Sequence, residues 1–477
     1  MNNIVLLNPP ISQQRVYGQA AAFGSVGAPT GLCYLAAQLR LLGYTPSIVD
    51  AEALNLDIAG AAAAILAQKP DLLGITCKTL WVKSAAAVAR LVKDALPNLP
   101  IVVGGNHVTA LPLGTLQEFP QFDYCVVGEG EETLPDLIQA LRYGDDLWKV
   151  DGIAYRNLDG VPVRSPLRQR LKNLDRLPPP AYDLLPELMS HYWPLFCNVD
   201  RYPAFSVFIS RGCHGQCRFC DRSTFGNEVT RHSPEYVVRM LRNLRDEHNI
   251  RYIVFDDDNF TTNRAYLLDL LRHMVKSKVH LPFSCLSRVD TVDPALLKDL
   301  RRAGCRRIMY GIESGSQRML DAMNKGITLD QVRTAIAATK AVGIKTYGYI
   351  MLGFPGETEC SMAETVAFVR ELKLFDVGCQ PFVPPVGSAI YQNIHSHGTF
   401  TEDWDTLGAA GEVPFVAHGL SRALILDYVD QCYRACYNRA YQYLTLHRRI
   451  RSLRQLKLVL KYLFGKKEVL RLRKPTT

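Results

Sequence analysis

The chain has 477 residues, of which 48% are hydrophobic and 21% are charged, and it carries a formal net charge of +9. The length predicts more than one domain, and the composition is ordinary for a soluble globular protein. The N-terminal segment has no basic region ahead of its short apolar run, and no apolar run approaches 18 residues, so neither a signal peptide nor a membrane-spanning helix is expected. The 13 cysteines are odd in number and mostly scattered, which predicts free thiols in a reducing cytoplasm.

Residues 1–145 alternate short apolar runs with helical stretches. Continuous apolar strands between helices favour an α/β domain with a parallel, doubly wound, Rossmann-like or flavodoxin-like sheet. The expected strands are 3–9, 46–51, 71–76, 100–105 and 122–131, and the expected helices are 30–44, 58–68, 84–96 and 132–144. On such sheets, ligands bind beyond the carboxyl ends of the strands.

The rest of the chain divides into three predicted regions. Residues 146–198 are expected to be a linker with a small hairpin turning near Asp159 and Gly160, followed by a proline-rich stretch. Residues 199–390 resume the alternation and predict a partial barrel of six β/α units. Its expected strands are 205–210, 252–257, 283–288, 307–312, 345–352 and 376–383. Residues 391–477 are predicted to be mainly helical.

The stretch RGCHGQCRFC places three cysteines on a loop that follows a strand, where β/α enzymes carry their chemistry. Cys213, Cys217 and Cys220 have C-x3-C-x2-C spacing. Three thiolates can hold three irons of a four-iron cluster, which leaves the fourth iron open to a substrate or cofactor. Gly212 and Gly215 are expected to let the loop fold tightly around the cluster.

A zinc site is the alternative interpretation of these cysteines. His214 or a distant residue would then supply the fourth ligand. Zinc loops usually bring paired Cys-x2-Cys or His spacings, and none is visible nearby. The iron–sulfur interpretation is therefore favoured.

The cysteine motif resembles the signature of radical SAM enzymes, in which an aromatic residue, here Phe219, precedes the last cysteine. The resemblance implies that Cys213, Cys217 and Cys220 bind a [4Fe–4S] cluster. Its fourth iron would chelate the amino and carboxylate groups of S-adenosyl-L-methionine (SAM). An electron from an external donor would then break the sulfonium bond and release a 5′-deoxyadenosyl radical, chemistry that needs a dry, closed pocket.

Later stretches fit the same fold, and the resemblance assigns them to SAM. GIESGS ends a strand, and its region contacts the ribose and methionine parts of SAM in the family. SRVD ends the preceding strand, and YIMLGFPGET has the character of the family's adenine-side loop. The residues concerned are Arg288, Gly311, Glu313, Ser314, Gly353 and Gly356. Asp256, Asp257 and Asp258 follow another strand, where an acid is commonly only a helix cap or a solvated group.

Small residues also gather at the carboxyl edge of the first domain, after its fourth and fifth strands. Together with their polar neighbours they are Gly104, Gly105, His107, Gly128, Glu129 and Gly130. A broad flat ligand can lie against such an edge. No G-x-G-x-x-G pattern follows the first strand, so a dinucleotide is not expected. The stretches NPP, GGNHVTALP and VVGEGEET resemble the cobalamin-binding domain that precedes many radical SAM cores.

One departure concerns the axial ligand of cobalamin. Cobalamin mutases supply a lower histidine from a D-x-H-x-x-G motif, and this chain has none. The expected binding mode is therefore base-off without a histidine ligand. His107 is either a cofactor contact or a residue at a helix start or turn.

The resemblance implies a cobalamin-dependent radical SAM enzyme, most of whose relatives are methyltransferases acting on unactivated carbon. One SAM would methylate cob(I)alamin, and a second would give the radical that abstracts a substrate hydrogen. The substrate radical would then take the methyl group from cobalamin. The alternative is cyclisation or rearrangement without net methylation, as in anaerobic magnesium-protoporphyrin ester cyclases. An apolar, polycyclic or lipid-like small molecule is an expected substrate, and no pattern identifies a catalytic acid or base.

A tRNA methylthiotransferase is a third interpretation, because such enzymes carry a second cluster on three N-terminal cysteines. Cys33, Cys77 and Cys125 are available here, but two of them lie in strand-like runs and are expected to be buried. Four irons per chain would favour the first interpretation and eight this one.

The positive charge is concentrated in the C-terminal tail. Between Arg448 and Lys474 there are 11 Lys or Arg against one acid. Apolar residues at helical spacing among them predict an amphipathic basic helix, which either binds an anionic membrane surface or docks on the protein with one face solvated. The expected location is therefore cytoplasmic, with peripheral contact at the inner membrane face as one alternative, and nucleic acid is not an expected partner. Cys432 and Cys436 are interpreted as packing residues.

Overall fold

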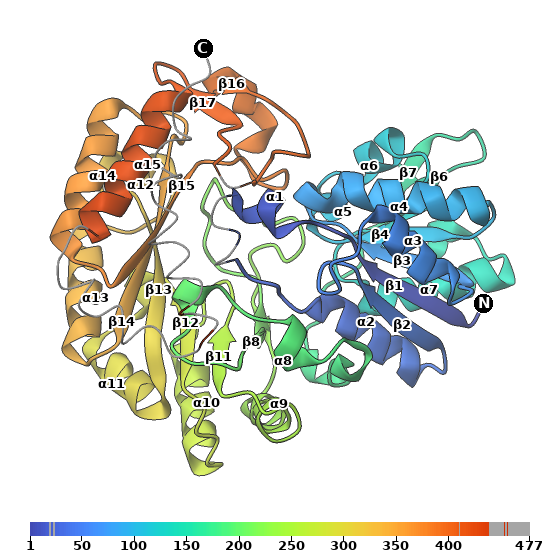
Figure 1. The fold of residues 1–477 in the computed structure, drawn as a ribbon, viewed down its shortest axis with the longest axis horizontal. Coiled ribbons are helices and arrows are strands. Elements are labelled where there is room, and N and C mark those ends of the chain that lie inside the picture. The colour runs from blue at the N-terminus through green and yellow to red at the C-terminus, as the bar shows by residue number, and fades with distance from the viewer. Residues whose placement is uncertain (19–20, 22–23, 410, 438–452, 454–455, 457–477) are drawn as a thin grey trace.

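The computed structural model describes residues 1–18, 21, 24–409, 411–437, 453 and 456. Two sheets flanked by helices occupy the two sides of the molecule in Figure 1. One is entirely parallel, and the other is parallel except for an antiparallel hairpin at one edge. Two short antiparallel strand pairs accompany them. Within the described ranges, no helix has both the length and the apolar character needed to span a bilayer.

The N-terminal sheet has seven strands in the order β2-β1-β3-β4-β5-β6-β7. They are β1 (Asn3–Asn8), β2 (Thr45–Asp50), β3 (Leu72–Thr76), β4 (Ile101–Gly104), β5 (Tyr124–Val126), β6 (Ile153–Arg156) and β7 (Pro162–Arg164). The first five are parallel, and their 2-1-3-4-5 order is flavodoxin-like, which confirms the predicted doubly wound fold. The strand order reverses between β1 and β3, and such sheets bind ligands beyond the carboxyl ends of the strands at that point.

Helices cover both faces of this sheet, and Ile4 to Leu7 of β1 are therefore almost completely buried. They are α1 (Gln13–Tyr17), α2 (Thr30–Leu41), α3 (Ile58–Leu66), α4 (Val82–Ala95), α5 (Asn106–Ala110), α6 (Pro112–Glu118) and α7 (Gly130–Tyr143). β5 is shorter than the expected 122–131 because Gly128 adopts a φ of +87° and α7 begins two residues later. The hairpin expected around Gly160 forms, and it pairs antiparallel with β5 at the edge of this sheet.

The second sheet has six parallel strands in the order β15-β14-β13-β12-β11-β8, which confirms the predicted partial barrel. They are β8 (Ala204–Val207), β11 (Tyr252–Phe255), β12 (Phe283–Ser287), β13 (Cys305–Glu313), β14 (Lys345–Leu352) and β15 (Asp376–Pro381). The helices of this part and of the segment before it are α8 (Leu188–His191), α9 (Pro234–Asp246), α10 (Arg264–Lys276), α11 (Pro294–Ala303), α12 (Gln317–Ala322), α13 (Leu329–Ala341) and α14 (Glu359–Leu372). β9 (Ser210–Arg211) and β10 (Thr230–Arg231) form a short antiparallel pair.

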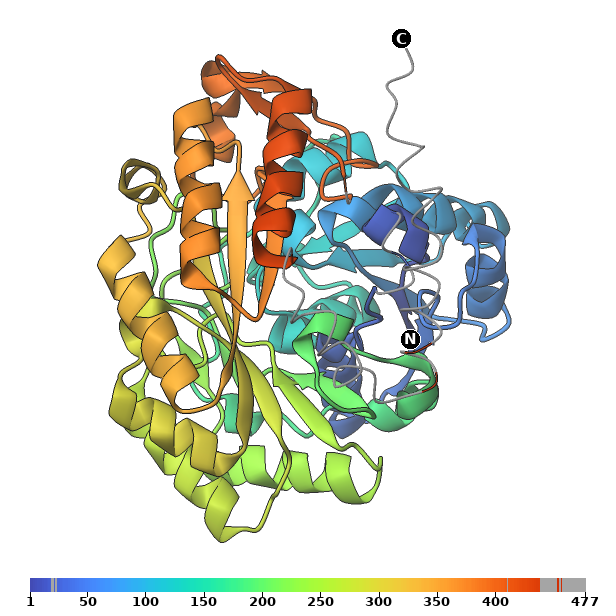
Figure 2. The same ribbon diagram turned by 60° about the vertical axis from the view of Figure 1, so that its left-hand side comes forward.

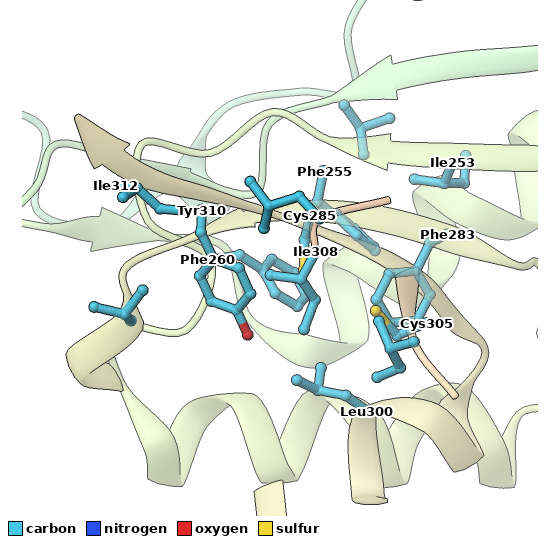
Figure 3. Close-up of a cluster of buried hydrophobic side chains, with 14 of the residues drawn as sticks. Ile253, Phe255, Phe260, Phe283, Cys285, Leu300, Cys305, Ile308, Tyr310 and Ile312 are labelled. Carbon is cyan, nitrogen blue, oxygen red and sulfur yellow. The ribbon is translucent and has the colours of Figure 1, made fainter. Parts of the chain in front are cut away.

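A core of aromatic and aliphatic side chains fills the space between the second sheet and its helices, as Figure 3 shows. Phe255, Phe283 and Tyr310 project from three neighbouring strands, and Leu300 reaches them from α11. The rings of Phe255 and Phe283 pack edge to face with centroids 5.2 Å apart. Close packing of this kind fixes the strands, and hence the loops at their carboxyl ends.

The C-terminal region combines a hairpin with a helix. The hairpin, β16 (Gly398–Phe400) with β17 (Phe415–Ala417), was not expected in a mainly helical segment. Helix α15 (Arg422–Tyr437) lies beside α14 in Figure 2 and buries Cys432 and Cys436, which are packing residues as predicted. The basic segment 448–474 lies outside the described residues except for Leu453 and Leu456, so its membrane contact stays a prediction.

One apolar cluster joins the carboxyl edges of the two sheets. From the first sheet it takes Leu7, at the end of β1, and Cys77, just after β3. From the second it takes Phe354 and Phe382, which follow β14 and β15. Trp404 of the C-terminal region belongs to the same cluster. The edges at which each sheet would bind a ligand therefore face each other across shared packing.

Candidate active site

The cysteine loop is anchored to the end of β11 by two aspartates. The Asp257 carboxylate accepts hydrogen bonds from the backbone N–H groups of Ile209 and Ser210, at 3.0 and 2.5 Å, and from the Ser210 hydroxyl. Asp258 accepts one from the N–H of Gly212 at 3.0 Å. These two aspartates, for which the sequence analysis left a helix-cap role open, therefore hold the start of the cysteine loop in place.

The two loop glycines differ, since close contacts require a glycine at Gly212 but not at Gly215. Gly212 has a φ of +91°, and any Cβ there would collide with the carbonyl of Glu228. A Cβ on Gly215 would lie 3.4 Å from Cys213 Sγ and 3.8 Å from Cys217 Sγ, in the space beside the two thiols. That space is where a cluster bound to these sulfurs would lie.

The three thiols influence one another electrostatically. Desolvation raises the pKa of Cys220 to about 12, and Asp258, Cys217 and Cys213 add to the rise. The raised pKa favours the protonated thiol of Cys220. Bound iron would favour the thiolate instead, because a coordinating thiol is deprotonated. In a four-iron cluster each of the three sulfurs would bind a different iron, which three thiolates on one loop can supply.

A buried charge pair lies beside the cysteine motif. Glu313 ends β13 with a φ of +66°, and its carboxylate is 2.7 Å from the ammonium of Lys325. The Lys325 nitrogen also lies 5.6 Å from the ring centroid of Phe219. A Cβ on Gly311 would come within 2.6 Å of the Glu313 carboxylate, so only glycine leaves room for this pair. The sequence pointed to Glu313 but missed Lys325, which lies 12 residues further on.

Arg288 connects three parts of the site. Its guanidinium binds Asp290 through two nitrogens at 2.9 and 2.8 Å. It also donates to the carbonyl of Lys325 at 2.8 Å and lies 3.8 Å from Cys217 Sγ. The strand end, the Lys325 loop and the cysteine loop are therefore held by one side chain.

Two of the other expected SAM residues make contacts within the protein. Ser314 is fully buried, and its hydroxyl bonds to Thr365 of α14. Gly353 has a φ of +88°, and a Cβ there would press on Ile425 of α15 at 3.0 Å. Gly356 has a φ of +84° with no atom near a Cβ position, so it keeps the open backbone expected of a ligand loop.

The first sheet presents His107 in a buried setting. Only 1% of the residue is exposed, its Nδ1 is 3.3 Å from the Thr79 hydroxyl, and its ring packs edge-on against Trp404. Burial lowers the pKa of His107 to about 4, so the ring is neutral at pH 7. Gly105 has a φ of +109°, and a Cβ there would lie 2.7 Å from the carbonyl oxygen of Cys77, so this position requires glycine.

Glu129, expected to contact cobalamin, is part of a buried ion-pair network with the cysteine loop. Arg211, two residues before Cys213, donates to Glu129 at 2.7 Å and to Glu131 at 2.6 Å. The side chains are only 13%, 6% and 6% exposed. The N–H of Leu171 donates to the remaining oxygen of Glu129 at 2.9 Å. The local stretch GEGEET does not encode this long-range pairing, which the sequence analysis did not predict.

The remaining edge residues leave room for a broad ligand. Gly128 has a φ of +87° with no atom within 4 Å of a Cβ position, whereas a Cβ on Gly130 would touch Leu35, and one on Gly104 would only touch Val126. His107 is the one histidine in residues 1–145. This edge therefore fits a large flat cofactor bound without a histidine from a D-x-H-x-x-G motif.

The N-terminal cysteines do not gather into a second thiol site. Cys33, Cys77 and Cys125 are each 0% exposed, and burial raises the pKa of all three thiols. Cys33 belongs to a different core cluster from the other two. The cysteines act as small apolar residues, which removes the main sequence argument for a methylthiotransferase.

Comparison with known proteins agrees with this layout. The family model described as the Radical SAM superfamily matches residues 207–369, and that described as the B12 binding domain matches residues 18–138. An uncharacterized methyltransferase of Pyrococcus horikoshii is 35% identical over 352 residues, covering 74% of this chain and 75% of that protein.

Two further comparisons extend the similarity. An anaerobic magnesium-protoporphyrin IX monomethyl ester cyclase of Rubrivivax gelatinosus is 30% identical over 349 residues, which cover 72% of this chain and 62% of the cyclase. The structure of the cobalamin-dependent S-adenosylmethionine radical enzyme OxsB, with aqua-cobalamin and S-adenosylmethionine bound, superposes with a TM-score of 0.76. The superposition covers 98% of this chain and 71% of OxsB at 17% identity, and it shows a shared fold.

Replacing Arg211 tests the ion-pair network. Arg211→Met leaves Glu129 and Glu131 buried without their main partner, and we expect it to lower the free energy of unfolding by about 3 kcal/mol. Arg40→Met breaks an ion pair with Asp183 whose side chains are 46% and 63% exposed, and it should cost less than about 1 kcal/mol. Equal losses in urea titrations of the two variants would contradict the role given to Arg211.

Replacing His107 tests its burial as a neutral ring. The unfolded chain binds a proton near pH 6.5 and the folded chain only near pH 4, so folding stability is lost as the pH falls through this window. His107→Gln should remove up to roughly 3 kcal/mol of that loss. His418→Gln, an exposed histidine, should keep the wild-type dependence. An unchanged pH dependence in His107→Gln would show that burial does not lower the pKa of His107 in the folded protein.

Replacing a loop cysteine tests the metal site. Anaerobically reconstituted wild type should hold about four irons per chain, and Cys217→Ser should lose most of the iron and the visible absorbance. Cys360→Ser, an exposed cysteine on α14, is the matched control and should retain both. Iron retained by Cys217→Ser, or zinc in its place, would refute the assignment.

Proposed function

The chain belongs to the radical SAM enzymes that carry a cobalamin-binding domain, and we propose that it is a methyltransferase acting on an unactivated carbon of a small molecule. The observation that carries the proposal is the network of Arg211 with Glu129 and Glu131, which joins the cysteine loop to the edge of the cobalamin-binding domain. A methyl donor and a radical source that work on one substrate need such a fixed arrangement. The name of the Pyrococcus horikoshii relative, a methyltransferase, supports the reaction class.

The family's cofactors are a [4Fe–4S] cluster, SAM and cobalamin. When bound, SAM with the cluster supplies a radical that removes a substrate hydrogen, and cobalamin supplies a methyl group. We propose that Cys213, Cys217 and Cys220 hold the cluster. Phe219 of the cysteine loop and residues in or just after β12 to β14 would hold SAM, the latter being Arg288, Gly311, Glu313, Ser314, Gly353 and Gly356. Gly104, Gly105, His107, Gly128, Glu129 and Gly130 would form the cobalamin edge.

The chain's own residues keep the site ordered and dry. Asp257 and Asp258 fix the cysteine loop on β11 before any cofactor binds. Arg288 ties that loop to the Lys325 turn, so the polar groups of Glu313 and Lys325 stay in place. The apolar cluster around Phe354, with its neighbours from both sheets, would exclude water between the two edges.

We also infer the division of labour along the chain. Residues 1–145 would bind cobalamin, 146–198 would link the halves, 199–390 would carry the radical core, and 391–477 would close the site. Trp404, whose ring packs on His107 and whose N–H donates to Glu118 at 2.9 Å, supports a closing role for the last region. The electron would come from an external donor, and an apolar or polycyclic substrate would suit the apolar edges.

A cyclase is the second candidate, because the Rubrivivax gelatinosus relative with that activity matches 72% of this chain. It would use the same residues without leaving a methyl group on the product. The products of SAM separate the two functions, since only methyl transfer consumes SAM to S-adenosylhomocysteine.

The experiment is an anaerobic incubation of the fully reconstituted chain with SAM, a low-potential reductant and a small-molecule extract. A methyltransferase should form S-adenosylhomocysteine and 5′-deoxyadenosine in roughly equal amounts and carry deuterium from methyl-labelled SAM into a product. Formation of 5′-deoxyadenosine without S-adenosylhomocysteine or label would favour the cyclase. Cys217→Ser is the control and should form no 5′-deoxyadenosine.

A further inference from the structure

A cavity of about 590 Å³ opens at the amino ends of the second sheet, away from the cysteine loop. It lies among residues that precede or begin the strands, including Tyr252 of β11 and Lys345 of β14. The cysteine loop follows the carboxyl end of β8, so the strands separate the two places. At about 3.3 Å per residue, a strand of four or five residues puts roughly 15 Å between them. The cavity is therefore distinct from the proposed active site.

The lining of this cavity is strongly basic. Its cationic or titratable side chains are Arg201, His280, Arg301, Arg302, Arg306 and Lys345. Asp200 is the acid among the lining residues, and it is already engaged by Arg307 at 3.0 Å and Lys345 at 2.7 Å. Across the part of the chain that the structure describes, no carboxylate pairs with Arg201, Arg301 or Arg306. Arg302 pairs with Asp299 at 3.3 Å, so three converging guanidinium groups are left without a counter-charge and attract an anion.

A buried hydroxyl supplies a second, independent indication of a ligand. Tyr252 is 0% exposed and lines the cavity. Its hydroxyl makes no hydrogen bond of standard geometry among the described residues, and Ser284 is the neighbouring polar side chain. Buried polar groups are nearly always satisfied, so an unpaired donor in a basic cavity points to an acceptor that binds there.

The favourable interaction of basic side chains with a helix end explains the positions of only two of these residues. Arg301 and Arg302 lie in the last turn of α11, where basic side chains interact favourably with the helix end. Arg201 and Arg306 lie outside any helix, and neither they nor Tyr252 gain from that end. The convergence of these groups on one cavity therefore needs a different explanation.

We propose that this cavity binds a phosphate-bearing small molecule. Guanidinium groups match phosphate oxygens in fork geometry, and the Tyr252 hydroxyl would donate to another oxygen of the same anion. The volume falls within the range of about 300–1,000 Å³ found for small-molecule sites, which suits a nucleoside diphosphate or a sugar phosphate. The site would add a binding function to the protein without taking part in radical chemistry.

The test is calorimetric titration of the full-length protein with inorganic phosphate, pyrophosphate and adenosine diphosphate. We expect saturable binding of at least one of these three probes. Tightest binding of inorganic phosphate or pyrophosphate would indicate a free anion as the ligand, and tightest binding of adenosine diphosphate would indicate a phosphorylated metabolite. The double variant Arg301→Ala/Arg306→Ala should weaken it at least tenfold. Tyr252→Phe, which keeps the ring, should weaken it severalfold while the melting curve stays near wild type.

A matched control separates a built site from general charge. Arg272→Ala removes a positive charge from α10, where Arg272 is 76% exposed and does not line the cavity, and it should leave the affinity unchanged. Equal weakening in Arg272→Ala, or no saturable binding of any probe, would overturn the proposal. Preferential binding of a short single-stranded RNA, lost in the same double variant, would overturn it in favour of a nucleic-acid site.

Discussion

The arrangement of the two halves depends on the guanidinium of Arg211. It lies between the rings of Tyr34 and Phe225, 5.5 and 5.9 Å from their centroids, and binds Glu129 and Glu131 in the other half. Burial alone would lower the pKa of Arg211, and the two carboxylates outweigh it and raise the pKa above its ordinary range. Arg170 adds a longer contact to Glu129 at 3.7 Å. These buried charges are tolerable only together, so the halves are stable in this relative position and costly to separate.

Because the Arg211 network fixes the two halves, the apolar cluster between the sheets can shield the proposed active site. Two α/β sheets each present a ligand-binding edge, and here both edges end in one shared packing layer. Loops from β11, β12 and β13 then converge on the cysteine motif through Asp257, Arg288 and Glu313. A radical formed between these edges would meet apolar side chains before water, which is the environment that hydrogen abstraction requires.

Local sequence patterns were enough to predict most strands and the position of the cysteine loop. Continuous apolar runs located nearly all the strands of both sheets, and the spacing of the cysteines located the loop that follows β8. Contacts between distant segments carried no such signal. The pairing of Glu129 with Arg211 was not predicted, because the two residues lie 82 positions apart in different sheets. The hydrogen bond of Ser314 to Thr365 of α14 was not predicted either, because it depends on how the helix packs on the strand. The hairpin of β16 and β17 was missed because its three-residue strands are too short for a pattern.

The central claim is that one chain holds an iron–sulfur cluster and cobalamin across a shared interface. Electron paramagnetic resonance of the anaerobic protein, loaded with both groups and reduced so that both are paramagnetic, tests it most directly. We expect a dipolar interaction between the cluster and cobalamin that disappears when either group is omitted. Two independent signals identical to those of the singly loaded protein would contradict it.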